Sequence, residues 1–597
     1  MKHQKISLSW KLDFNHVPPH IASHTKMFGS TTQNGSIRSW LFTLAFLLFS
    51  HPSITYSYRS HIHLSRQSID SCLTSLNVTY PGESSFHSFS QAFNSRLSYT
   101  PAAIVLPSSV QDVERLVTCG AYLKLPVVSR SGGHSYAGYG LGGVDGALVA
   151  DLSSLKQITL SGDNVVVQTG NILGEVATYL WDHGRRALPH GTCPKVGTGG
   201  HTSYGGYGPY SRMAGLLMDR VVSADVVLAN GTSVTASEVS HPDLFWALKG
   251  AAPSYGIVTS WTYSTLTAPM ISVSFFISLP RYTSGDTFAT AFSKYQAFVH
   301  TAPRELAMAF AFGGDSKGIG AQLTGNYFGS KSNFINLVSG LVKFLNGSIS
   351  HADEYSDWTK LLVANGGEQL VTTGPSPPNT FFAKSLVTFD LLDDSSLKRW
   401  GDYLVNTAIH TDIGWFAQAD LYGGAISSDF DASSSSFAHR DAFLVFQFYG
   451  SSKDNAPYPS DGMDVINKML TSLSPNPTAA YPNYIDPSLS DSEWQSQYFG
   501  TNMARLREIK ASYDPNNVFK FPQSIPVGNM ADTRTPTQSM GTRKNSISGT
   551  GGDDVPLNPH LHKNSDTCLP ETTVTSLTAF PFCLDSFHPF KFDIVPM

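Results

Sequence analysis

Short apolar runs alternate with helical patterns in the stretch from residue 98 to residue 270. The apolar runs have the length and β-branched content of buried strands, and they lie at 102–106, 124–129, 147–151, 165–169, 221–228 and 233–236. The last two are joined by Asn230-Gly231, a pair that favours a tight hairpin turn. One helix is expected after the capping-box pair Ser109 and Asp112, and another over 173–183. This mixture predicts an α+β domain over residues 98–270.

The pattern becomes richer in strands beyond residue 270. Runs that favour antiparallel strands lie at 271–279, 306–312, 321–328, 381–389, 413–422 and 442–449, with helical stretches between some of them. They predict one antiparallel sheet backed by helices, in a second domain over 271–480. A closing helix and loop are expected within 498–525. From about residue 530, Thr, Ser, Gly, Pro and Asn dominate without periodicity, so we expect 530–597 to be a disordered tail.

The N-terminal region carries one long apolar run, at residues 40–49, which follows Arg38. A membrane span needs about 18 apolar residues, so the run is typical of the central part of a signal peptide, and 1–57 is expected to be a leader. Asn77, Asn230 and Asn346 each begin a glycosylation sequon. We therefore expect a secreted, extracellular glycoprotein without a membrane anchor once the leader is removed.

Charge and cysteine content narrow the choice of partners. A net charge of −5 offers no general polycation for nucleic acid, and a small-molecule partner and a monomer are expected instead. The five cysteines leave one thiol to explain in an exported protein. Cys72 and Cys119 are candidates for a structural disulfide, and Cys568 and Cys583 lie together in the tail. Cys193 stands alone in a glycine-rich loop.

The first chemical motif is Arg-Ser-Gly-Gly-His-Ser-Tyr at residues 130–136, directly after a predicted strand. Its paired glycines, Gly132 and Gly133, allow backbone N–H groups to approach a phosphate, and Arg130 would add a bidentate partner. A plain turn is the alternative. The spacing does not match the glycine fingerprint of a dinucleotide-binding Rossmann fold.

The second motif covers residues 189–208, where seven glycines follow position 190. So many glycines exclude a ladder strand or a helix interior, while Pro194 and Pro209 argue against simple flexibility. A segment that lies close against a flat ligand fits better than a loose loop. His190, Cys193 and His201 raise the alternative of a metal site, but their spacing matches no standard zinc pattern, so no metal is expected.

Together with three later segments, these motifs resemble the FAD-linked oxidases of the vanillyl-alcohol-oxidase superfamily, in the branch of berberine-bridge-like enzymes and glucooligosaccharide oxidases. The later segments are Asp-Leu-Phe-Trp-Ala-Leu-Lys-Gly at 243–250 with Tyr-Gly-Ile-Val-Thr at 255–259, Tyr-Pro-Asn-Tyr at 481–484, and Tyr-Phe-Gly at 498–500 with Asp-Pro-Asn-Asn at 514–517. All occur in the family's order within residues 98–527. The resemblance implies a PCMH-type FAD-binding domain at 98–270, completed by 481–527, and a substrate-binding domain at 271–480. One departure is Gly-Ala-Ala-Pro-Ser at 250–254, where the family often has a longer glycine run.

The resemblance also implies that FAD is held by two covalent bonds, through His134 and Cys193. Imidazole and thiolate are nucleophilic enough to add to the electrophilic benzenoid edge of a flavin, and the attachment accounts for the odd cysteine. The remaining residues expected to bind the cofactor are Arg130, Gly132, Gly133, Ser135, Gly197, Gly199, Gly200, His201, Gly205, Gly256, Val258 and Asn502.

Tyr484 is the catalytic base that the resemblance implies. A free phenol has a pKa of about 10 and is a weak base at neutral pH, so neighbours that lower this pKa are expected. Asp420 is the main candidate to tune the phenol, either by accepting the Tyr484 proton or by orienting its hydroxyl. It alternates with Phe416 and Gln418 on one face of a predicted strand, which resembles the strand that places an aromatic, an amide and an aspartate over the flavin in carbohydrate-oxidising members of the family. Gln447 and Tyr136 are expected to complete the polar pocket, and Tyr481 is expected to contribute packing.

The expected reaction is hydride transfer from a C–H bond of an alcohol to FAD, with O2 as the final acceptor and H2O2 as product. Val196, three residues after Cys193, is small at a position that the family associates with access of oxygen, so the resemblance favours an oxidase over a dehydrogenase. The preferred substrate is a reducing oligosaccharide that is oxidised to a lactone. The alternatives are an oxidative tailoring enzyme of secondary metabolism and a secreted flavoprotein without catalysis.

Overall fold

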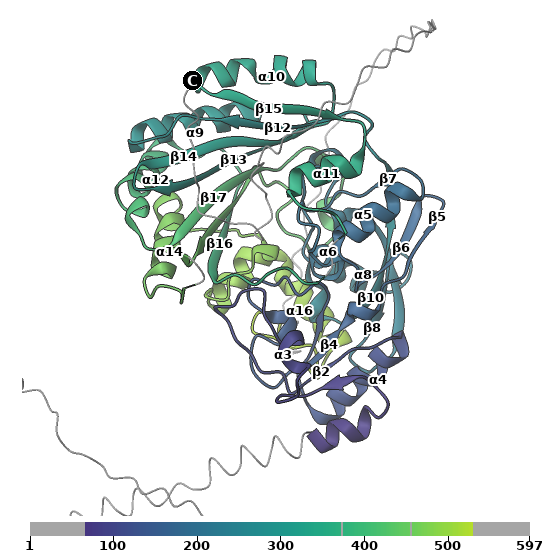
Figure 1. The fold of residues 1–597 in the computed structure, drawn as a ribbon. Helices are drawn as coiled ribbons and strands as arrows, with labels where there is room; N and C mark the ends of the chain where they lie inside the picture. The colour runs from purple at the N-terminus through teal and green to yellow at the C-terminus, as the bar shows by residue number, and fades with distance from the viewer. Residues whose placement is uncertain (1–65, 372–373, 454–455, 529–597) are drawn as a thin grey trace, which may run out of the picture. The chain divides into compact units, whose positions relative to one another are not determined.

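The computed structural model describes residues 66–371, 374–453 and 456–528 (Figure 1). The predicted leader at 1–57, the predicted tail at 530–597, and Cys568 and Cys583 lie outside the described residues. The asparagines of the three sequons, Asn77, Asn230 and Asn346, are all exposed. Within the described ranges, no helix combines the length and apolar character that crossing a bilayer needs.

A small mixed sheet opens the fold, in the order β1-β2-β4-β3. Its strands are β1 (Val78–Thr79), β2 (Ala103–Val105), β3 (Val127–Arg130) and β4 (Leu148–Asp151), and β4 runs parallel to both β2 and β3. Helix α4 (Val110–Leu123) begins at Ser109, whose side chain accepts from the Asp112 amide while Asp112 caps Ser109 in return. The predicted capping box is therefore confirmed, and α4 buries its apolar face in the same core as β2 and β4.

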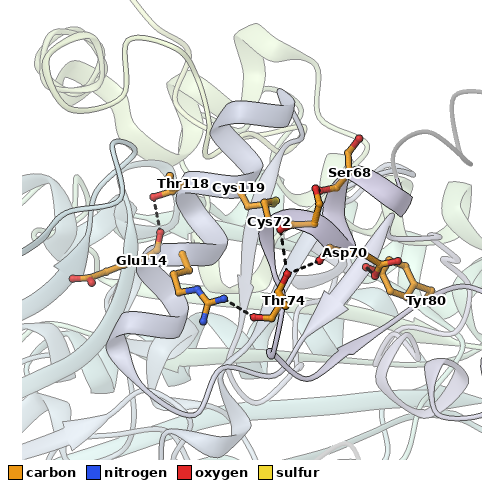
Figure 2. Close-up of a disulfide and its surroundings, with 10 residues drawn as sticks. Ser68, Asp70, Cys72, Thr74, Tyr80, Glu114, Thr118 and Cys119 are labelled. Atoms are coloured by element: carbon orange, nitrogen blue, oxygen red, sulfur yellow. Dashed lines mark hydrogen bonds between the residues drawn. A yellow bond between two sulfur atoms is a disulfide. The ribbon is translucent and has the colours of Figure 1, made fainter.

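A disulfide between Cys72 and Cys119 ties the segment before β1 to helix α4, as predicted (Figure 2). The two Cα atoms lie 5.8 Å apart. Around it, the Thr74 hydroxyl donates to the backbone of Asp70, and the Thr118 hydroxyl donates to the Glu114 carbonyl at 2.8 Å. The cross-link fixes the N-terminal edge of the small sheet.

An antiparallel sheet of five strands follows, in the order β5-β6-β10-β8-β9. The strands are β5 (Ile158–Ser161), β6 (Asn164–Gln168), β8 (Val221–Val227), β9 (Ser233–Ser237) and β10 (Ile257–Ser264), and helices α5 (Leu173–Asp182) and α8 (Pro242–Ala251) pack against them. The apolar pattern predicts β6, β8, β9 and α5 but not β10. Hydroxyl side chains interrupt β10, and they are satisfied inside the sheet, where Ser260 donates to Asp225 at 2.6 Å.

The largest sheet has seven antiparallel strands in the order β15-β12-β14-β13-β17-β18-β16. They are β12 (Ser272–Ser278), β13 (Leu306–Asp315), β14 (Gly318–Tyr327), β15 (Ser348–Tyr355), β16 (Phe381–Thr388), β17 (Gly414–Leu421) and β18 (Leu444–Ser451). Helices α9 (Gly285–His300), α12 (Asp394–Asn406) and α14 (Gly462–Leu473) cover one face, where they share an apolar core with alternate strand residues (Figure 1). Six of the strands are predicted; β15 is a mostly exposed edge strand of polar sequence, which gives no apolar signal.

The closing segment returns to the first two sheets. Helix α16 (Met503–Tyr513) is anchored by Lys510, whose buried ammonium pairs with Asp514 at 2.6 Å and donates to the carbonyls of Ser254 and Phe519. Tyr255 donates its hydroxyl to the Leu506 carbonyl at 2.7 Å. The domain boundaries expected at 270 and 480 stay predictions, and both fall between regular elements of the structure.

Candidate active site

A cavity of about 370 Å³ lies between the glycine-rich loops and the face of the seven-stranded sheet that the helices leave uncovered. Most of the predicted site residues line it: Arg130, Gly132, Gly133, His134, Ser135, Tyr136, Cys193, Gly197, Gly199, Gly200, His201, Gly256, Val258, Asp420, Gln447 and Tyr484. Ala252 and Pro253, from the segment that departs from the family pattern, also line it. Residues as far apart in the chain as Val128 and Phe521 therefore meet around one space.

The two glycine motifs touch through their backbones. A Cβ atom on Gly132 would lie 2.4 Å from the Gly197 nitrogen, and one on Gly197 would lie 2.1 Å from the Gly132 nitrogen. Gly133 has a φ of +72°, in the left-handed region that favours glycine. The Ser131 hydroxyl joins the loops further, since it accepts from the Gly199 amide at 3.2 Å and donates to the Thr169 carbonyl. No larger residue fits at either contact.

His134 projects from the first loop and stacks on Phe93, with ring centroids 3.8 Å apart. Desolvation by the surrounding protein, together with the charge of Lys195, lowers the pKa of His134 from 6.5 to about 4. The imidazole is therefore neutral at physiological pH, which is the form that carries a nucleophilic ring nitrogen.

Arg130, expected to bind a phosphate in a bidentate manner, is instead paired with a carboxylate of the protein. Its guanidinium forms an ion pair with Asp151 at 2.9 Å, and both side chains are largely buried. The parallel register of β3 and β4 sets Arg130 directly beside Asp151 and so explains the pairing. Arg130 lines the cavity, but part of its donor capacity is already used to hold the loop.

The second loop is fixed by the start of helix α5. The amides of Leu173 and Gly174 donate to the carbonyls of Val196 and Pro194, both at 2.9 Å, on either side of Lys195. Cys193 precedes this anchored stretch, is half-buried, and takes part in no disulfide. The loop thus presents its thiol from a rigid support.

His201 follows on the short helix α6 (Thr198–Ser203), and its Nε2 accepts from the Gly191 amide at 3.0 Å. Burial lowers the pKa of His201 to about 3, helped by His190 and His134. The ring is therefore neutral with its proton on Nδ1. Among the residues that the structure describes, no group of three or more His, Cys, Asp or Glu side chains is arranged to hold a metal ion.

The uncovered sheet face supplies a polar pair from β17. Gln418 donates to the Asp420 carboxylate at 2.7 Å, and Phe416 lies on the same face of the strand. Asp420 is buried, and this burial raises its pKa from 3.8 to about 7, although the bond from Gln418 opposes the shift. Asp420 can therefore both hold and release a proton near neutral pH.

Gln447 on β18 sits directly opposite Gln418 in the strand register. Its amide donates to the Tyr136 hydroxyl at 2.8 Å, so it links the sheet to the loop that carries His134. Tyr136 in turn stacks on Tyr484, with ring centroids 5.9 Å apart and an interplanar angle of 15°. The four residues predicted to be catalytic are thereby brought to one wall of the cavity.

The expectation that neighbours lower the pKa of Tyr484 is wrong. Burial raises this pKa well above 10, and the negative charge of Asp420 raises it further. A carboxylate next to a phenol opposes the formation of a phenolate, because two like charges would share a poorly solvated site. Tyr484 is therefore a protonated phenol at rest, whereas Asp420 is the stronger acid of the two and is the group that ionises near neutral pH.

Tyr481 does more than pack, which corrects the sequence expectation. Its hydroxyl accepts from the amides of Gly206 and Tyr207 at 3.2 and 3.1 Å and from the Asn483 side chain at 2.9 Å. Asn483 also donates to the His201 carbonyl at 3.1 Å. The Tyr-Pro-Asn-Tyr segment therefore holds the end of the glycine-rich loop, which the position of Asn483 between two motif tyrosines could have suggested.

Two predicted cofactor residues, Gly205 and Asn502, do not line the cavity. Gly205 lies against the ring of Phe437, and Asn502 donates to the Ser436 carbonyl at 3.2 Å. Conversely, sequence reasoning misses Asn94, which donates to the Tyr136 carbonyl at 2.9 Å and accepts from the Phe381 amide. The segment around Asn94 has no periodicity, so no signal in the sequence marks it.

Comparison with known proteins agrees with this site. Residues 101–237 match the FAD binding domain family, and residues 480–526 match the family described as berberine and berberine like. The chain is 37% identical to a xylooligosaccharide oxidase of Thermothelomyces thermophilus and 35% identical to a chitooligosaccharide oxidase of Gibberella zeae, each over 79% of this chain and 96% of the relative. A solved structure of glucooligosaccharide oxidase from Acremonium strictum, whose FAD is described as 6-S-cysteinyl and 8α-N1-histidyl, aligns with a TM-score of 0.72 and 31% identity over 77% of this chain and 99% of that one.

Proposed function

Because the chain belongs to the family of FAD-linked oxidoreductases that includes these carbohydrate oxidases, we propose that it oxidises reducing oligosaccharides at the anomeric carbon to lactones. The protein is an enzyme that acts on a small molecule, and FAD is its cofactor. The observation that carries the proposal is the meeting of Asp420 and Tyr484 with His134 and Cys193 around one cavity.

The residues of the cavity fit FAD. Glycines of both loops line the cavity, and glycine allows the backbone to come close to a phosphate-bearing ligand. The neutral imidazole of His134 and the rigidly held thiol of Cys193 are the two nucleophiles expected to attach it. When bound, FAD supplies the hydride acceptor that the side chains of the protein lack.

The protein's own residues handle the hydroxyl proton. As the substrate C–H bond yields its hydride, the hydroxyl proton must leave, or a positive charge would build up on the carbon. Tyr484 accepts this proton on its oxygen while its own proton passes toward Asp420, whose pKa of about 7 suits an acceptor at neutral pH. Such a relay avoids a long-lived phenolate, which the raised pKa of Tyr484 disfavours.

Gln418 and Gln447 have supporting tasks in this scheme. Gln418 holds the Asp420 carboxylate through its amide, and Gln447 holds the Tyr136 hydroxyl, whose ring stacks on Tyr484. Both glutamines lie side by side on neighbouring strands, so they fix the acceptor and the phenol relative to each other.

The oxidising partner is proposed to be O2, with H2O2 as product. Val196 lines the cavity three residues after Cys193, and its small side chain supports access of O2 to the cofactor. Export of a monomer is part of the same proposal, and the exposure of all three sequon asparagines supports it.

The test is a panel of reducing sugars and aromatic alcohols incubated with the purified holoenzyme, with H2O2 as the readout. Reducing xylo-, gluco- and chito-oligosaccharides are expected to give H2O2 and the matching aldonic acids. Oxidation of aromatic alcohols alone would instead favour a tailoring enzyme, and no turnover of any alcohol would overturn the proposal.

A further inference from the structure

An amide pair occupies the wall of the cavity that is supplied by β14 and helix α11 (Trp358–Gly366). Asn326 donates to the Asn365 oxygen at 3.0 Å, and Asn365 donates back to the Asn326 oxygen at 2.9 Å. Both residues line the cavity, and both are buried, with 0% and 6% of their surface exposed. None of the catalytic steps above uses them.

The hydrogen bonds of this pair leave two positions open. Asn326 donates its second N–H to the Val273 carbonyl at 3.4 Å, and the Asn365 oxygen also accepts from the Ser274 hydroxyl at 3.2 Å. One N–H of Asn365 and one lone pair of the Asn326 oxygen remain. A buried N–H without an acceptor is costly, and Asn365 is the member of the pair with exposed surface, so this edge offers a donor to the oxygen of a hydroxyl group.

Helix α11 is held firmly against the cavity. Leu370, just beyond its end, packs with Trp358 and Leu361 of the helix and with Trp181 of α5. Lys195, two residues after Cys193, pairs with Glu368 at 3.5 Å. Helix α11 lies beside α5 (Figure 1), so these contacts fix the position of Asn365 relative to the loop that carries Cys193.

The strand register sets the distance from the reacting end. Ala309 on β13 pairs with Asp420 on one side and with Thr324 on the other, and Ala307 pairs with Asn326. Strands lie about 4.8 Å apart, so about 10 Å separates the strand of Asp420 from the strand of Asn326. Strand β13, between them, contributes the small residues Ala307, Ala309 and Ala311 to the cavity lining, which leaves space for a chain of sugar rings.

We propose that Asn365, oriented by Asn326 and Ser274, binds a hydroxyl group of the third sugar unit of the substrate. The inference rests on the proposed function, with the first ring at Asp420, the second over the alanines and the third at the amide pair. Each ring is about as long as one strand spacing, so three rings reach from β17 to β14. Asn365 is therefore a specificity-determining residue for chain length.

The test compares xylose, xylobiose and xylotriose, together with the matching glucose series, in the wild type and in Asn365→Ala. Loss of one neutral hydrogen bond should raise KM for the trisaccharide by about three- to tenfold, while kcat and all constants for the mono- and disaccharide stay unchanged. Ser274→Ala should shift the trisaccharide KM in the same direction by a smaller factor, and it serves if Asn365→Ala folds poorly. Asn336→Ala, on the exposed face of helix α10 (Lys331–Phe344), is the matched control and should change nothing.

The outcomes separate this inference from the proposed function. If the wild type oxidises sugars and the trisaccharide KM is the same in Asn365→Ala, the third subsite is wrong and the proposed function stands. A parallel rise of KM for all chain lengths would show that the pair merely supports the cavity, and would overturn the inference as well. Failure of the wild type to oxidise any sugar would refute the proposed function, and with it the inference that rests on it.

Discussion

Replacement of Asp420 by Asn should stabilise the protein at high pH while slowing its reaction. A carboxyl whose pKa is higher in the folded state than in the unfolded state binds its proton more tightly when folded, so it lowers stability as pH rises between the two values. For Asp420 these values are about 7 and 3.8, and the difference corresponds to about 4 kcal/mol at a pH well above 7. Asn has the same shape, never ionises, and can still accept the bond from Gln418.

Urea unfolding of the holoenzyme at pH 5 and pH 8.5 measures this effect. At pH 5 the variant should be more stable by only about 2 kcal/mol, because the unfolded wild-type carboxyl is already ionised there while the folded one is still protonated. At pH 8.5 the variant should be more stable by up to the stated amount, although relaxation of the site will reduce it. The same variant should reduce its flavin more slowly and lose the part of the pH–rate profile that titrates near 7. A stability difference that is equal at both pH values would refute the assignment of Asp420 as a buried acid that exchanges protons.

Three further predictions concern the base, the cofactor and the loop. Tyr484→Phe should slow anaerobic flavin reduction by about 10²–10⁴-fold in stopped-flow measurements, with FAD still attached; an unchanged rate means that the base lies elsewhere. His134→Ala and Cys193→Ala should each leave one covalent bond, and the double variant should release FAD on acid precipitation, whereas free FAD from the wild type would contradict the attachment. Tyr481→Phe removes an acceptor from the Gly206 amide and should lower the free energy of unfolding by about 1–3 kcal/mol, and a variant as stable as the wild type would show that the loop is held without it.

The elements that the sequence predicts well are those whose signal is local. The capping box of α4, the Asn230-Gly231 hairpin and six strands of the large sheet follow from residues that are close in the chain. Strand β15 is not predicted, because an exposed edge strand needs no apolar residues. The hydroxyl-rich β10 is not predicted, because its polar groups find hydrogen-bond partners only in the folded sheet.

The candidate site also has features that the sequence predicts and features that it does not. The identity of its residues is predicted by the motifs, since His134, Cys193, Asp420 and Tyr484 come together as the resemblance implies. Its electrostatics do not follow, because the pKa values of Asp420 and Tyr484 depend on burial, which no local pattern encodes. Likewise, the pairing of Arg130 with Asp151, 21 positions apart in the chain, depends on how two strands align.

The backbone contact between Gly132 and Gly197 links cofactor attachment to assembly of the fold. His134 and Cys193 sit on separate loops, and only chains in which these loops have docked can present both nucleophiles to one flavin. A flavin that is attached through both bonds therefore shows that the two loops of that molecule have docked as they do in the folded protein. The ratio of covalently bound flavin to protein, measured by flavin absorbance after denaturation, gives the fraction of molecules in a preparation that have folded correctly. This measurement needs no substrate.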